Sequence, residues 1–147
     1  MRIAIMGTGG VGGYFGARLA VVGQDVHFVA RGAQLAAIRA HGLRVESPRG
    51  DLHLRDIKVT DTPAEIGTAD LVLFGVKLWD TEAAAAAIRP LVGEHTAVMS
   101  LQNGVVKDDI LRRALGERAI VGGVGYIAAT IAEPGVIRHT GTMQKLV

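Results

Sequence analysis

The chain begins with the stretch Arg2-Ile-Ala-Ile-Met-Gly7-Thr-Gly9-Gly-Val-Gly12, in which a short apolar run leads directly into the glycine pattern G-x-G-x-x-G. In such a pattern Gly7 lets the chain turn sharply off a strand, Gly9 lets the backbone approach a phosphate, and Gly12 lets the next helix lie close to the sheet. A plain packing turn can look similar. Here apolar residues precede the glycines and follow them at helical spacing, so we predict a strand, a turn and a helix whose first amides bind a dinucleotide pyrophosphate.

The composition is that of a single globular domain. A chain of 147 residues with 49% hydrophobic residues can bury one core. It has no cysteine, which excludes disulfides and thiolate chemistry and is compatible with the cytoplasm, where we expect the protein to act. The formal charge of +2 is scattered along the chain, so nucleic acid is not an expected partner. The histidines lack metal-ligand spacing, and no apolar run is long enough to predict a membrane span.

Strand and helix signals alternate along the chain, which is typical of βαβ units on a parallel sheet. We therefore expect a Rossmann-like α/β fold: a mostly parallel sheet with helices on both faces and a small inserted antiparallel hairpin. The expected strands cover residues 2–6, 25–30, 70–76, 96–101 and 119–124, and the expected helices cover residues 11–22, 32–41, 81–92 and 107–115. The hairpin pairs residues 43–45 with residues 52–54 around the turn Ser47-Pro-Arg-Gly50.

Three further local features are expected. The segment Thr62-Pro-Ala-Glu65 combines a capping box with proline at the first helical position, which predicts a short helix. Asp80 or Thr81 is expected to cap the alanine-rich helix that follows. The tail from Pro134 to Val147 has the pattern of another hairpin.

A basic residue, Arg31, directly follows the second expected strand. In a dinucleotide fold an acid at this place binds the ribose hydroxyls, whereas a basic residue meets a 2′-phosphate. A guanidinium group can bind a phosphate through two parallel hydrogen bonds, and no carboxylate is adjacent in the sequence. The sequence therefore favours NADP over NAD. The alternative is a solvated arginine at the end of a strand.

Two polar residues follow later strands, and parallel strands bring such residues to one edge of the sheet. Lys77 follows the apolar strand 70–76, so its ammonium is expected at the edge of the sheet where ligands bind. The alternative is a charge that only keeps the surface soluble. Asn103 precedes Gly104, a pair typical of a hairpin turn. The sequence after it has a helical pattern, so we expect Asn103 on a strand-to-helix loop. Trp79 is expected in the core, with a cleft wall or a partner contact as the alternatives.

Five segments together resemble, in order and spacing, the N-terminal domain of ketopantoate reductases, which are NADPH-dependent 2-dehydropantoate 2-reductases of pantothenate synthesis. The segments are Gly7-Thr-Gly9-Gly-Val-Gly12, Val29-Ala-Arg31, Gly75-Val-Lys77-Leu-Trp79-Asp-Thr81, Leu101-Gln-Asn103-Gly104 and Pro134-Gly-Val-Ile-Arg-His-Thr-Gly141. The resemblance implies that Arg31 contacts the 2′-phosphate, that Lys77 and Asn103 lie near the nicotinamide and the substrate, and that Ala129 offers its backbone to the cofactor.

The candidate cofactor-binding residues come from the glycine-rich turn and from this resemblance. They are Gly7, Thr8, Gly9, Gly10, Val11, Gly12, Arg31, Lys77, Asn103 and Ala129. Lys77 and Asn103 are also the candidate substrate-binding residues, and no metal ligand is expected.

The resemblance also implies a second, helical domain whose lysine donates the proton and whose polar residues hold the keto acid, and this sequence ends before it. We therefore expect residues 1–147 to form one NADP-binding domain without a catalytic residue of its own, Lys77 being auxiliary at most. Its expected partners are a small 2-oxo acid and either a second copy or the missing domain. The alternatives are a non-catalytic redox-sensing module that binds NADP, and the cofactor domain of another dehydrogenase of 2-oxo acids or polyol phosphates.

Overall fold

The computed structural model describes residues 1–147 and contains a six-stranded sheet in which every adjacent pair of strands is parallel. The strands in spatial order are β5 (Lys58–Thr60), β2 (Asp25–Val29), β1 (Arg2–Met6), β6 (Leu71–Phe74), β7 (Ala97–Ser100) and β8 (Ile120–Val121). Counted by their order along the chain, these strands run 3-2-1-4-5-6, which is the strand order of Rossmann folds. The expected α/β fold is confirmed.

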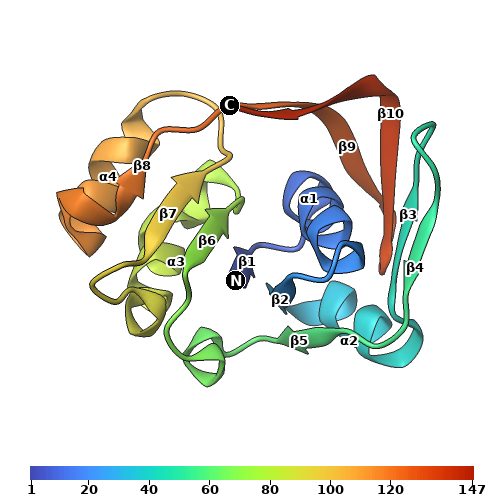
Figure 1. The fold of residues 1–147 in the computed structure, drawn as a ribbon, viewed down its shortest axis with the longest axis horizontal. Helices are drawn as coiled ribbons and strands as arrows, with labels where there is room; N and C mark the ends of the chain where they lie inside the picture. Colours follow the sequence, from blue (N-terminus) through green and yellow to red (C-terminus); the bar gives the residue numbers. More distant parts are fainter.

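Helices cover both faces of this sheet (Figure 1). They are α1 (Gly10–Val21) and α2 (Gly32–His41) on one face, and α3 (Thr81–Ala87) and α4 (Val106–Leu115) on the other. Strand β1 shows why both faces are apolar: Ile3 and Ile5 pack in the same cluster as α1, whereas Ala4 and Met6 pack in the cluster with α3 and α4. None of the helices is both long and apolar enough to cross a bilayer.

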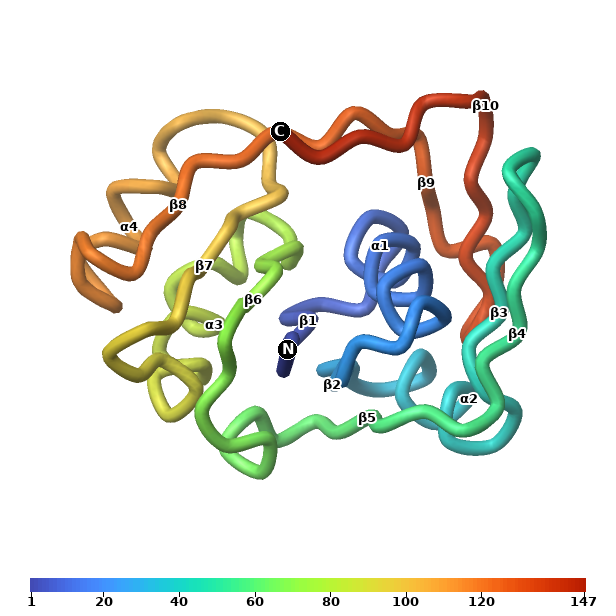
Figure 2. The backbone as a smooth tube through the Cα atoms, viewed as in Figure 1, coloured from blue at the N-terminus to red at the C-terminus, as the bar shows by residue number.

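A second sheet packs against α1 on the side away from the first (Figure 1). Its strands in spatial order are β4 (Leu52–Leu54), β3 (Leu43–Glu46), β10 (Val136–Leu146) and β9 (Gly125–Glu133). The β3–β4 pair is the expected antiparallel hairpin, and β3 also pairs in parallel with β10. Figure 2 shows that the chain begins in the middle of the molecule and that the β9–β10 ribbon carries its end back toward β8.

Three of the expected elements have the wrong limits or the wrong pairing. The helix expected over 81–92 ends at Ala87 and is followed by the 3-10 helix η3 (Arg89–Leu91), because Pro90 has no backbone N–H to donate and its ring disfavours the preceding helical turn. The strand expected over 119–124 is reduced to β8 after the 3-10 helix η4 (Glu117–Ala119). The expected tail hairpin is instead one long strand, β10, which pairs with β9 across the turn at Pro134 and Gly135. The sequence pattern also missed β5.

The expected caps do not form. Glu65 lies in the 3-10 helix η1 (Pro63–Ile66), and its carboxylate accepts a hydrogen bond from the hydroxyl of Thr60 at 2.5 Å rather than closing a box with Thr62. Neither Asp80 nor Thr81 caps α3 through its side chain. The Thr81 hydroxyl donates to the Leu78 carbonyl, at 2.7 Å, within the 3-10 helix η2 (Leu78–Asp80) that precedes α3.

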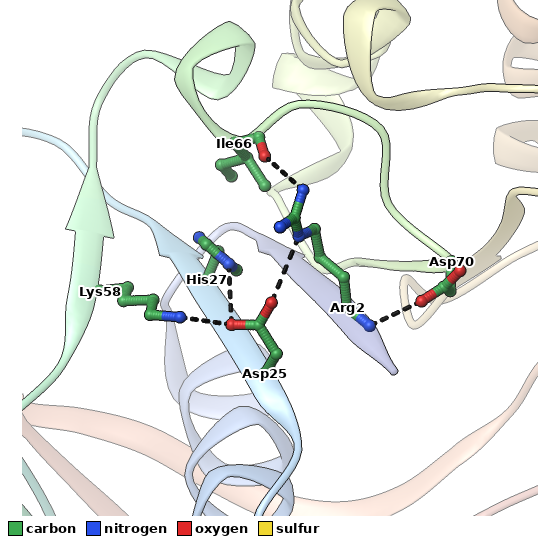
Figure 3. Close-up of polar contacts among 6 residues, drawn as sticks. All are labelled: Arg2, Asp25, His27, Lys58, Ile66 and Asp70. Atoms are coloured by element: carbon green, nitrogen blue, oxygen red, sulfur yellow. Dashed lines mark hydrogen bonds and ion pairs between the residues drawn. The ribbon is translucent and has the colours of Figure 1, made fainter.

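A network of charges joins the amino ends of the central strands (Figure 3). The Asp25 carboxylate at the start of β2 lies 2.5 Å from the Lys58 ammonium of β5, 3.2 Å from Nε of Arg2 in β1 and 3.0 Å from Nε2 of His27. The backbone amide of Arg2 also donates to Asp70, at 2.7 Å, just before β6. The Lys58 ammonium, against partial burial and together with Arg2 and His27, holds the pKa of the Asp25 carboxyl well below its usual range.

We expect Asp25→Asn to lower the free energy of unfolding at pH 7 by about 1 kcal/mol, the upper end for partly exposed ion pairs. A carboxyl whose folded-state pKa is lowered stabilises the fold above its unfolded-state pKa, near 3.8, and loses that contribution as the pH falls further. Urea unfolding of both proteins at pH 7 and pH 3 measures this effect. A stability difference that stays the same at pH 3 would contradict the assignment.

Candidate functional site

The glycine-rich turn joins β1 to α1, and two of its glycines have structural reasons of their own. Gly7 has a positive φ of 98°, a conformation that disfavours any side chain. A Cβ at Gly12 would lie 2.2 Å from the carbonyl oxygen of Gly7, so α1 can start at this distance from β1 only with glycine there. Gly9 differs from both, because a Cβ at Gly9 would meet no protein atom within 4 Å and its φ is −87°. The space in front of Gly9 is open to a ligand.

The first backbone amides of α1 lie next to this open space and have no partners in the chain. The first backbone hydrogen bond of the helix runs from the Gly13 amide to the Gly9 carbonyl at 2.8 Å. The amides of residues 9–12 donate to no acceptor within the chain. They form a positive helix terminus beside an open surface, which is the arrangement that binds phosphate groups.

Two side chains hold this turn in place. The amide and the hydroxyl of Thr8 both donate to the Val29 carbonyl of β2, at 3.1 and 2.8 Å. The Gln34 side chain donates to the Thr8 carbonyl at 2.9 Å and accepts from the Gly135 amide at 2.8 Å. The amide, the hydroxyl hydrogen and the carbonyl of Thr8 are therefore all used within the fold, and Thr8 positions the turn. The sequence analysis missed Gln34, because its partners are distant in sequence.

A cleft of about 410 Å³ opens beside the turn, at the carboxyl ends of β1, β2 and β6. This is the point where the strand order reverses and where ligands bind in such folds. Of the expected cofactor-binding residues, the cleft is lined by Gly7, Thr8, Gly9, Arg31 and Lys77. It is not lined by Gly10, Val11, Gly12, Asn103 or Ala129. Lining residues that were not expected include Gln34, Asp61, Pro63, Asp80 and Ile131.

Ala129 lies against the start of α1. A Cβ at Gly10 would be 2.2 Å from the Ala129 carbonyl oxygen, so β9 and the glycine-rich turn are in direct backbone contact. Ile131, two residues further along β9, lines the cleft and is 45% exposed. Strand β9 therefore forms one wall beside the turn.

Arg31 stands at the mouth of the cleft, just after β2. Its side chain is 82% exposed, and its guanidinium lies 2.9 Å from the carboxylate of Asp80, which belongs to η2 on the other side of the cleft. Because Arg31 uses one nitrogen in this pair, its other donors remain free for a bound anion.

Lys77 and Asn103 lie on neighbouring loops at the same edge. Lys77 follows β6, and Asn103 lies on the loop from β7 to α4, as expected; both are exposed. The Gln102 side chain joins these loops, because it donates to the Val76 carbonyl and to the Thr81 hydroxyl, each at 2.9 Å. The sequence analysis did not identify this role.

Apolar side chains surround the same edge. Trp79 is 81% exposed, so the expectation of a core tryptophan is wrong. Leu78, Val105 and Val106 are also more than half exposed. The two loops therefore expose polar and apolar groups together, although these four apolar residues do not line the cleft itself. No cluster of His, Cys, Asp or Glu suited to a metal ion is present.

Comparison with known proteins identifies the family. The model of the family described as "Ketopantoate reductase PanE/ApbA" matches residues 3–147. The chain belongs to the ketopantoate reductase family. A 2-dehydropantoate 2-reductase of Mesorhizobium japonicum is 33% identical over 95% of this chain and 49% of its own length. A protein of the same name from Archaeoglobus fulgidus is 37% identical over 95% of this chain and 44% of its own length.

Solved structures of this family, whose members are oxidoreductases, agree with the fold. The 2-dehydropantoate 2-reductase from Geobacter metallireducens superposes with a TM-score of 0.91 at 41% identity, over 97% of this chain and 47% of that protein. A D-mandelate dehydrogenase solved with NADH superposes with a TM-score of 0.85 at 24% identity, a likeness of fold alone. The chain spans about half the length of the curated relatives it matches.

Gly9 and Gly12 have different surroundings, and this difference allows a matched test. We expect Gly9→Ala to change the free energy of unfolding by less than about 0.5 kcal/mol, as at an open surface site, and to weaken nucleotide binding about tenfold, because the new methyl group occupies the phosphate position. Gly12→Ala should lower the free energy of unfolding by about 2 kcal/mol through its clash with Gly7. Urea unfolding and calorimetric titration measure the two effects. Equal losses of stability in both variants would contradict this division of roles.

Proposed function

We propose that residues 1–147 form the NADPH-binding domain of a cytoplasmic 2-dehydropantoate 2-reductase, which reduces ketopantoate to pantoate. The observation that carries this proposal is the arrangement of the cleft, which is lined both by Gly9, immediately before the unpaired first amides of α1, and by Arg31, whose side chain is exposed. Amides suit the pyrophosphate, and a guanidinium beyond β2 suits a 2′-phosphate. The curated relatives named above support the choice of substrate.

The residues of this chain fit such a cofactor without rearrangement of the turn. A Cβ at Gly9 would enter open space, so the backbone there can approach a phosphate closely. When bound, NADPH supplies a hydride from C4 of its nicotinamide. Gly9 and the amides after it would hold the pyrophosphate, and Arg31 would hold the 2′-phosphate in place of, or beside, Asp80.

Lys77 and Asn103 would act at the other end of the cofactor. An ammonium group and a side-chain amide at the carboxyl ends of β6 and β7 can donate hydrogen bonds to the nicotinamide carboxamide or to the oxygens of a 2-oxo acid. Ketone reduction also requires a proton at the carbonyl oxygen. We propose that the proton donor lies outside residues 1–147, and that a further domain covers Trp79, Leu78 and the neighbouring apolar rim. The relatives are about twice as long as this chain, and this difference supports the division.

Arg31→Ala tests the choice of cofactor. We expect it to weaken NADPH binding by about tenfold or more and to leave NADH binding nearly unchanged, because a charge-assisted bidentate contact to phosphate is lost. Asp80→Asn is the matched control, since it removes the partner of Arg31 and keeps the guanidinium; NADPH binding should be retained or become tighter. Fluorescence titration with both cofactors measures these affinities. Equal affinities of the unmodified chain for NADPH and NADH would overturn the proposal of NADP specificity.

The division of labour between domains has its own test. With NADPH and ketopantoate, we expect the 147-residue chain to turn over at least about 100-fold more slowly than a full-length relative such as the Geobacter protein, because general acid catalysis contributes a factor of this size. NADPH oxidation followed at 340 nm, a standard wavelength, gives the rate, and a parallel binding titration shows that the cofactor is bound. Turnover close to that of the full-length protein would show that the proton donor lies within this chain.

A further inference from the structure

A second hollow, of about 490 Å³, lies outside the dinucleotide cleft and shares no residue with it. It is formed where the end of α2, the base of the β3–β4 hairpin and the turn between β9 and β10 meet (Figure 1). Neither the sequence analysis nor the proposed function gives this place a role. We call it the α2 hollow.

The walls of the α2 hollow are held by close backbone contacts. Gly42, which ends α2, has a φ of 79°, and a Cβ there would be 2.1 Å from the Leu54 carbonyl oxygen at the end of β4. Gly135 in the β9–β10 turn has a φ of 82° and accepts a hydrogen bond from the Arg44 amide at 2.9 Å. Three segments distant in sequence are thus fixed to one another around the hollow.

The lining is strongly basic. Arg39 of α2, Arg44 of β3 and Arg55 beyond β4 are lining residues and are exposed, and His41 and His53 lie among them. Glu133 is the single carboxylate residue of the lining. The Nε2 atom of His53 lies 2.7 Å from the His41 carbonyl oxygen, so this ring is oriented by the end of α2.

These three arginines differ from most others in the chain. The side chains of seven arginines, among them Arg2, Arg31 and Arg138, contact a carboxylate or a carbonyl oxygen of the chain. The arginines that donate to no such group are Arg39, Arg44, Arg55, Arg89 and Arg118. Three of these five surround one concave surface. Positive charges placed together without internal partners repel one another, and an anion in the hollow would relieve that repulsion.

We propose that the α2 hollow is a binding site for a small molecule that carries a diphosphate or closely spaced phosphate groups. Each guanidinium can donate two parallel hydrogen bonds to phosphate oxygens, and three of them can share the charge of a diphosphate. The concave shape removes part of the ligand from water, which strengthens these contacts relative to those of isolated surface arginines. The site does not depend on the proposed function of the dinucleotide cleft.

Inorganic pyrophosphate serves as the probe, with binding followed by the amide signals of the ¹⁵N-labelled chain. The amides of His41 and Gly42 report on the α2 hollow, and those of Gly9 and Gly10 report on the dinucleotide cleft, so the two sites are read separately. We expect saturable shifts at His41 and Gly42 in the millimolar range or below. Absence of saturation at these two amides would overturn the proposal.

The double variant Arg44→Ala with Arg55→Ala should weaken pyrophosphate binding at the α2 hollow by about tenfold or more, and leave the response of Gly9 and Gly10 unchanged. The matched control is Arg89→Ala with Arg118→Ala, which removes two unpartnered arginines outside the hollow and the same net charge. This control should keep the wild-type affinity. Equal weakening in both double variants would show a general effect of charge and would overturn the site. The dispersion of the amide spectrum confirms that each variant is folded.

Discussion

The close approach between the start of α1 and the end of β1 is the contact on which both the fold and the cleft depend. Because Gly12 lies directly over the Gly7 carbonyl oxygen, the helix begins within reach of the sheet, and its first amides face the carboxyl ends of the strands. A side chain at Gly12 would push α1 away from the sheet and would also move the unpaired amides at its start. The packing of the helix and the position of its first amides therefore depend on the same glycine.

Much of the fold could be predicted from local patterns, because the first strands and helices are apolar segments separated by turn glycines such as Gly7, Gly23 and Gly42. The errors have both local and distant causes. Strand β5 has three residues and exists through its pairing with β2. The expected capping box between Thr62 and Glu65 does not form, because Glu65 accepts a hydrogen bond from Thr60 instead. The long β9 strand was obscured by its glycine-rich start, and its partner β10 lies beyond the turn at Gly135.

The polar residues of the candidate site could be predicted from the sequence. The contacts that position these residues could not. Arg31 and Lys77 line the cleft because each lies a few residues after the carboxyl end of a parallel strand, β2 and β6 respectively. The pairing of Arg31 with Asp80 joins two loops that are far apart in sequence, and no local sequence pattern predicts it. The same is true of Gln102, which ties the loops of β6 and β7 together. Trp79 was expected inside because large aromatic groups usually are, but it lies on an exposed 3-10 turn.

Gln34 has a consequence for motion. Its side-chain amide is shared between the Thr8 carbonyl in the glycine-rich turn and the Gly135 amide in the β9–β10 turn. If either segment opens, one of these hydrogen bonds breaks. The Gln34 atom that made it is partly buried and must then find water as its partner. The two turns are therefore coupled through one side chain, although more than a hundred residues separate them in the chain. Coupling of this kind would make the hydrogen-bonded amides of Thr8 and Gly135 exchange with solvent at similar rates.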